Sequence, residues 1–189
     1  LLDEVSFTEA MIATFSAVLA SPEFLFQCSQ PGKLDDFALA ERLALFLGES
    51  IPDKSLRALA RDGSLRKPEN LERQVDRLIE KPDFDRFVKE FLNAWLQLDE
   101  INDTDPDREL YPEYAGDWWL VNSMIKESQL FFADLVVNNR PASGLIDSDY
   151  TFLDERLARH YGVDGLQGPV FKRTKLPPQS PYGGILTQA

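Results

Sequence analysis

Apolar side chains recur at steps of three and four residues along most of the chain, from near its start to about residue 162. This spacing is the period of an amphipathic α-helix, and it predicts a mainly α-helical protein. Pro and Gly residues between the apolar stretches mark the connections. The pattern predicts a bundle-like or orthogonal domain of about seven helices, followed by an irregular C-terminal arm.

The most regular apolar stripe lies in residues 84–96, where it predicts one helix with a single aromatic face. The residues of that face are Phe84, Phe87, Val88, Phe91, Leu92, Trp95 and Leu96. A second long helix is expected from about Glu113 to Asn138. Its inward side chains are expected to be Trp118, Val121, Ile125, Phe132 and Leu135, with Met124 and Phe131 beside them. Both helices are expected to bury these side chains in one core.

The shorter helices follow from capping residues and apolar steps. Asp35 and Asp53 stand where N-cap residues are expected, and the helix after Asp35 is expected to turn Phe46 inward and to end at Gly48. A short helix restarting at Pro22 is expected to carry three apolar residues, Phe24, Leu25 and Phe26, into the core.

Near the C-terminus, Thr151 is expected to cap a helix spanning roughly Phe152 to Tyr161, with Gly162 ending it. Residues 170–176 could form one short strand before the Pro177-Pro178 pair. Because a single strand cannot form a sheet alone, we expect a covering arm or hairpin with little β-structure.

Composition narrows the classes of function. The chain has 189 residues, 43% hydrophobic and 28% charged, which suits one domain or two small packed ones. Its formal net charge of -12 argues against nucleic-acid binding and against docking on an anionic membrane surface. No apolar run approaches the roughly 20 residues that membrane insertion needs. The chain starts at Leu1 rather than Met, so we expect it to be part of something longer.

Single copies of cysteine and histidine exclude several kinds of site. With only Cys28 and His160, the chain cannot form an internal disulfide, a covalent haem attachment or a zinc site of four cysteines. Any histidine-dependent catalysis would have to use His160. The alternative is that His160, in the last turn of its helix, interacts with the helix dipole. No catalytic residue can be assigned from the sequence.

An acidic loop is the strongest candidate for a metal site. Carboxylates occupy every second position of it, at Asp103, Asp105, Asp107 and Glu109. Oxygen ligands at this spacing begin a calcium-binding loop, but Arg108 stands where such a loop needs Gly and Tyr114 where it needs Glu. The alternative interpretation is a solvated surface loop. No other cofactor is expected in this chain, haem included.

Two further features of the predicted helices are candidates for contacts, namely a pair of tryptophans and two charged residues on apolar faces. Trp118 and Trp119 are adjacent and must point about 100° apart on a helix, so we expect one inward and Trp119 either in the core or available to a partner. Arg42 and Glu127 each interrupt an apolar face and are candidates for an ion pair that fixes helix register.

Several long motifs occur in an order typical of one family. They are Ala20-Ser21-Pro22-Glu23-Phe24-Leu25-Phe26, Leu34-Asp35-Asp36-Phe37-Ala38-Leu39-Ala40-Glu41-Arg42-Leu43-Ala44-Leu45-Phe46-Leu47, Leu110-Tyr111-Pro112-Glu113-Tyr114 and Asp149-Tyr150-Thr151-Phe152-Leu153-Asp154-Glu155-Arg156-Leu157-Ala158-Arg159-His160-Tyr161-Gly162. The chain thereby resembles a planctomycete-type secreted cytochrome-like family, chiefly its domain of unknown function 1592.

The resemblance implies a division of the chain. Residues 1–27 would be the end of a preceding helical module packed onto the main domain. Residues 28–168 would be the main helical domain, and residues 169–189 a C-terminal arm and the start of a following module. It also implies an exported, periplasmic or secreted parent protein whose separate module carries c-type haem.

The functional expectation is a non-catalytic scaffold or interaction module. It would position the haem module near a redox partner or an extracellular target. The partners would be another protein or other modules of the same parent, and polysaccharide is a further candidate. The alternative is a carboxylate-based hydrolase or oxidoreductase domain, with calcium as a candidate cofactor.

Overall fold

The computed structural model describes residues 6–26, 32–103, 106–107, 109–114 and 117–188. Eight α-helices and one two-stranded sheet lie in these residues, which confirms the mainly α class. The α-helices are α1 (Phe7–Leu19), α2 (Pro22–Leu25), α3 (Asp36–Gly48), α4 (Lys54–Arg61), α5 (Pro68–Ile79), α6 (Phe84–Leu96), α7 (Trp118–Val137) and α8 (Glu155–His160). The strands are β1 (Tyr150–Leu153) and β2 (Lys172–Lys175), and short 3-10 helices connect several elements.

Acidic N-caps start several of the helices. The carboxylates of Asp35 and Asp53 accept hydrogen bonds from the backbone amides of Ala38 and Leu56, which confirms both predicted caps. The end of α3 differs from the expectation. Its left-handed residue is Glu49, with φ of 46°, and Gly48 still belongs to the helix.

The larger of two hydrophobic clusters joins α3, α4, α5, α6 and α7. Its completely buried side chains include Leu56, Leu65, Leu92 and Phe131. At its edge, Asp53 forms ion pairs with Arg77 at 2.7 Å and Lys81 at 2.6 Å. Partial burial acts to raise the pKa of Asp53, but the hydrogen bonds from Arg77 and Lys81 outweigh it and hold that pKa well below its usual range.

The smaller cluster lies where α7, β1 and α8 meet. Its buried residues are Leu120, Met124, Leu153, Leu157 and Ala158. Strand β1 pairs with β2 in antiparallel register, Thr151 opposite Thr174. The expected strand in residues 170–176 is therefore confirmed, but the predicted helix from Phe152 is wrong at its start. Thr151 lies in β1, and Asp154 caps α8 by accepting a hydrogen bond from the Leu157 amide.

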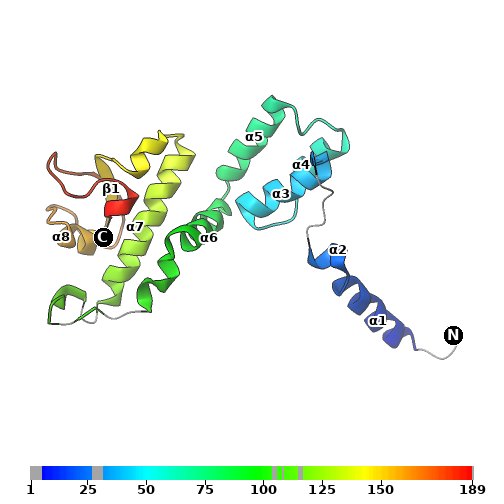
Figure 1. Ribbon diagram of the computed structural model, residues 1–189, viewed down its shortest axis with the longest axis horizontal. Helices are drawn as coiled ribbons and strands as arrows, with labels where there is room; N and C mark the ends of the chain where they lie inside the picture. Colours follow the sequence, from blue (N-terminus) through cyan, green and yellow to red (C-terminus); the bar gives the residue numbers. More distant parts are fainter. Residues whose placement is uncertain (1–5, 27–31, 104–105, 108, 115–116, 189) are drawn as a thin grey trace.

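Helices α1 and α2 lie apart from the other helices, at the N-terminal end of the molecule (Figure 1). No residue of either helix is buried. The prediction that Phe24, Leu25 and Phe26 enter the core is therefore wrong, because they are 58–67% exposed. The packing of residues 1–27 onto the main domain stays a prediction.

Three other aromatic side chains are more exposed than their helical spacing predicted. Phe46, Trp95 and Trp118 are 62%, 46% and 58% exposed. All three lie on faces that periodicity assigned to the interior. The buried face of α7 is rotated by about one residue from the predicted one, and it includes polar residues. Its buried members are Leu120, Ser123, Met124, Glu127, Ser128, Phe131, Phe132 and Leu135.

The C-terminal segment returns to α7, as Figure 1 shows. Ile185 is buried in the larger cluster, and the Gln188 side chain accepts a hydrogen bond from the Ser128 hydroxyl at 2.9 Å. Gly184 allows this return, because a Cβ there would lie 2.6 Å from the backbone carbonyl of Ile146 and its φ is 89°. The expected C-terminal arm is thus anchored on the helical body.

No helix in the described part of the chain is both long and apolar enough to cross a membrane.

Candidate functional site

A pair of exposed tryptophans marks the start of α7. The rings of Trp118 and Trp119 stack with centroids 4.1 Å apart, and the two residues are 58% and 55% exposed. Trp119 was the residue predicted to meet a partner, and its exposure leaves it accessible. Large aromatic side chains in this position supply apolar contact area with a polar N–H at the edge.

A pocket of about 250 Å³ opens beside Trp119, and we call it the tryptophan pocket. Its lining residues are Trp119, Ser123, Asp154, Glu155, Arg156, Gly168 and Pro169. Two of these, Ser123 and Asp154, are 7% and 5% exposed, so they form its buried side. The Ser123 hydroxyl donates to Asp154 Oδ2 at 2.7 Å, while Asp154 Oδ1 caps α8. The pocket therefore has the hydrogen-bonded pair Ser123–Asp154 on its buried side and the indole of Trp119 on an exposed side.

Hydrogen bonds and ion pairs hold the rim of the tryptophan pocket in place. The Gly168 amide donates to Glu155 Oε2 at 2.8 Å, and the Glu155 amide donates to the Gly168 carbonyl at 3.1 Å. The hydrogen bond from Gly168, followed by the charge of Arg159, lowers the pKa of Glu155. Arg156 reaches Asp117 at 2.6 Å, which links α8 to the N-cap of α7. These contacts hold α8 against both the segment at Gly168 and the start of α7, which are the two sides of the pocket.

Next to this pocket, the completely buried carboxylate of Glu127 is the centre of a hydrogen-bond network. Glu127 accepts hydrogen bonds from the hydroxyls of Thr151 and Tyr161, the latter at 2.8 and 2.9 Å. Gln188 extends the network to Thr151 through a hydrogen bond of 3.3 Å. Arg42, the predicted partner of Glu127, is exposed on α3 and lines a different surface. The network joins α7, β1, α8 and the C-terminal segment.

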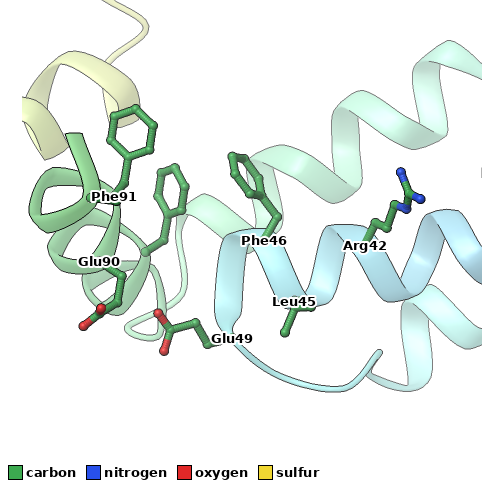
Figure 2. A pocket seen from close by; sticks show the side chains of 8 residues that line it. Arg42, Leu45, Phe46, Glu49, Glu90 and Phe91 are labelled. Atoms are coloured by element: carbon green, nitrogen blue, oxygen red, sulfur yellow. The ribbon is translucent and has the colours of Figure 1, made fainter. Parts of the chain in front are cut away.

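That other surface is an apolar groove between α3 and α6, with a volume of about 690 Å³ (Figure 2). Its rings come from Phe46, Phe87 and Phe91, with centroids 4.9 Å apart for Phe46 and Phe87 and 5.5 Å for Phe87 and Phe91. Figure 2 shows Glu49 and Glu90 at one end of the groove, while Arg42 lies at the other. The remaining lining residues are Leu45 and Ala94. We call this surface the α3–α6 groove.

The acidic loop lies only partly within the described residues, because Asp105 is outside them. The Asp107 carboxylate accepts hydrogen bonds from the backbone amides of Glu109 and Leu110 at 2.8 and 3.1 Å, so it stabilises a turn. The described residues contain no group of three or more side chains placed to hold a metal ion. Calcium binding by Asp103, Asp105, Asp107 and Glu109 stays a prediction.

His160 ends α8, as expected. In the described part of the chain its ring contacts the rings of Tyr114 and Tyr161, each with centroids 5.9 Å apart. Tyr161 in turn contacts Tyr182 of the C-terminal segment at 4.4 Å. His160 therefore belongs to a cluster of aromatic side chains.

Sequence reasoning singled out Glu127, but it missed Ser123 and Asp154 as buried polar side chains near Trp119. Asp154 could have been identified as an N-cap, because Leu157 follows it at the capping distance and a helix pattern begins between them. Ser123 and Glu127 are four residues apart on α7, which places them on one face. That spacing was a signal of a polar strip on an otherwise apolar helix.

The family described as "Protein of unknown function (DUF1592)" matches residues 34–163. This range covers α3 to α8, the tryptophan pocket residues of α7 and α8, and the α3–α6 groove. The chain belongs to this family. No curated protein and no solved structure is significantly similar to the chain.

Proposed function

We propose that this domain is a non-catalytic scaffold within an exported, cytochrome-like multidomain protein. It positions a separate c-type haem module near a redox partner or an extracellular target. The observation that carries this proposal is the presence of two exposed aromatic surfaces on one helical body. The α3–α6 groove lies between α3 and α6, and the tryptophan pair lies at the start of α7.

The α3–α6 groove is suited to another module of the same parent. Its walls are aromatic and aliphatic, so an apolar helix laid along it would remove those rings from water. Charges of both signs at its ends, Arg42 against Glu49 and Glu90, would set the direction of the incoming helix.

The second surface would then face the target. The net charge of -12 favours approach to a basic redox partner, because complementary charge raises the association rate more than the affinity. A scaffold needs both surfaces at once, since one holds the haem module while the other selects where it acts.

A binding measurement between separately produced modules tests the proposal. The parent's haem module is titrated with residues 1–189 in a calorimeter. We expect Phe46→Glu to weaken binding by at least about tenfold, because it places a charge against the ring of Phe87 in the groove. The matched control is Phe37→Glu on the same helix, which is also exposed but does not line the groove, and it should change affinity less than about twofold.

Absence of binding by the unchanged domain, or equal losses in the two variants, would contradict the scaffold proposal. The tryptophan pocket is untouched in both variants, so this experiment concerns the groove alone.

A further inference from the structure

The tryptophan pocket combines three features that together are typical of a ligand-binding site. One wall is an exposed indole, the buried side is a hydroxyl–carboxylate pair, and the rim carries Arg156 and Glu155. The Ser123 hydroxyl and both carboxylate oxygens of Asp154 each have a hydrogen-bond partner within the protein, and each oxygen keeps a lone pair that a ligand hydroxyl can use. We propose that this pocket binds one ring of a neutral sugar.

The hydrogen-bonding capacity of the pocket fits a ring with several hydroxyl groups. Ser123 donates its proton to Asp154, so its oxygen lone pairs can accept from a ligand hydroxyl. Asp154 accepts one hydrogen bond at each carboxylate oxygen, from Ser123 and from the Leu157 amide, and each oxygen has a second lone pair. Arg156 adds N–H donors at the rim.

The aromatic wall and the size of the pocket restrict the ligand further. Trp119 offers apolar contact to the C–H face of a ring, while Trp118 stacks against it and limits its rotation. At about 250 Å³, the pocket is smaller than the roughly 300–1,000 Å³ that holds drug-sized ligands. One ring therefore fits, and the rest of an oligosaccharide would lie outside.

Charge selects against acidic sugars. The lining residues include two carboxylates, on Asp154 and Glu155, and one guanidinium, on Arg156, which also pairs with Asp117. The chain as a whole carries a net charge of -12. A neutral ring avoids repulsion from these groups, whereas a carboxylated or sulfated ring does not.

This inference rests on the proposed function, because it makes carbohydrate the extracellular target of the scaffold. The test uses residues 1–189 and the intrinsic fluorescence of its tryptophans, with calorimetry as the second readout. The probes are glucose, galactose and mannose, each as the monosaccharide and as a tetraose. We expect saturable binding of at least one tetraose with a dissociation constant of about 0.1–10 mM.

Three variants locate that binding. Trp119→Ala should abolish it, and Ser123→Ala should weaken it by about tenfold, because the ring hydroxyl loses its acceptor. Ile51→Ala removes an exposed apolar side chain away from the pocket, and it should leave binding within about twofold. Glucuronate, the anionic counterpart of glucose, should bind at least about tenfold more weakly than glucose.

The inference is overturned if no probe gives a saturable signal, if Trp119→Ala binds as tightly as the unchanged chain, or if glucuronate binds better than glucose. In each case the groove measurement with Phe46→Glu is unaffected, so the scaffold proposal stands or falls separately. Far-ultraviolet circular dichroism of each variant verifies that it is folded.

Discussion

The two ends of this domain are stabilised by different chemistry. The body formed by α3 to α6 buries apolar side chains, with Gln74 as its buried polar residue in the described part of the chain. The end formed by α7, β1 and α8 also has an apolar cluster, but polar side chains cross it. Those buried polar residues are Ser123, Glu127, Ser128, Thr151 and Asp154. Each of the five has a hydrogen-bond partner on another element.

The difference shows what each end can do. An apolar core tolerates exchange of one aliphatic side chain for another of similar volume. A buried polar network needs every partner in place, so it fixes the relative positions of the elements that contribute to it. The polar end also carries the tryptophan pocket, where hydroxyl and carboxylate groups are already oriented.

The largest effect is expected in the apolar body. Leu56→Ala should lower the free energy of unfolding by about 2–5 kcal/mol, because Leu56 is completely buried and its removal leaves a cavity. Leu45→Ala on the exposed side of α3 is the control and should cost less than about 1 kcal/mol. Urea unfolding measures both, and equal losses would show that Leu56 does not belong to a buried apolar core.

A somewhat smaller effect is expected where the C-terminal segment meets the body. Gly184→Ala should cost roughly 2–3 kcal/mol, because the new Cβ meets the Ile146 carbonyl at 2.6 Å and Ile185 leaves the core. Gly165→Ala is the matched control, since its φ of 92° gives the same backbone strain with no atom near its Cβ. Hydrogen exchange should rise in residues 182–188 only in the first variant.

The next largest loss of stability is expected in the hydrogen-bond network around Glu127. Glu127→Gln should destabilise the domain by about 1–3 kcal/mol, because an amide NH₂ replaces an oxygen that accepts from the hydroxyls of Thr151 and Tyr161. Glu90→Gln, at the exposed edge of the α3–α6 groove, should be nearly neutral. Thermal unfolding compares the two, and a neutral Glu127→Gln would mean that this network does not set the difference between the ends.

The smallest effect concerns pH. The pKa of Asp53 lies below its unfolded value of about 3.9, so its contribution to stability is present above that pH and is lost as the pH falls below it. Asp53→Asn keeps a capping side chain but removes the charge, and it should flatten this part of the stability profile. Urea midpoints between about pH 5 and pH 2 measure the slope. An unchanged slope would show that the ion pairs with Arg77 and Lys81 contribute nothing.

The two ends also differ in how much of their structure the sequence could predict. In α3 to α6 the caps at Asp35 and Asp53 located the starts of α3 and α4, and the apolar steps located α6, because capping and periodicity are local properties. The rings of Phe46 and Trp95 were assigned to the core wrongly. Periodicity identifies an apolar face, but it does not say whether another element is there to cover it.

Near the tryptophan pocket the local signals were insufficient. Thr151 has the right chemistry for a helix cap, and only its pairing with Thr174 of β2 shows that it lies in a strand. The buried face of α7 depends on partners in β1, α8 and the C-terminal segment, which lie 24 to 60 residues away along the chain. Trp119 was a candidate from the sequence, whereas Ser123 and Asp154 required the fold.

One side chain, Asp154, connects the tryptophan pocket to the folding of α8. Its Oδ1 atom holds the first turn of the helix through Leu157, while its Oδ2 atom holds Ser123 in the pocket. A change that removes both carboxylate oxygens therefore loosens α8 and alters the pocket together. Asparagine retains a capping oxygen and replaces the second oxygen with an amide nitrogen, so it is the substitution that separates the two roles. If the pocket binds a sugar as proposed, its ligand preference can vary at this position only within the small set of residues that still start the helix.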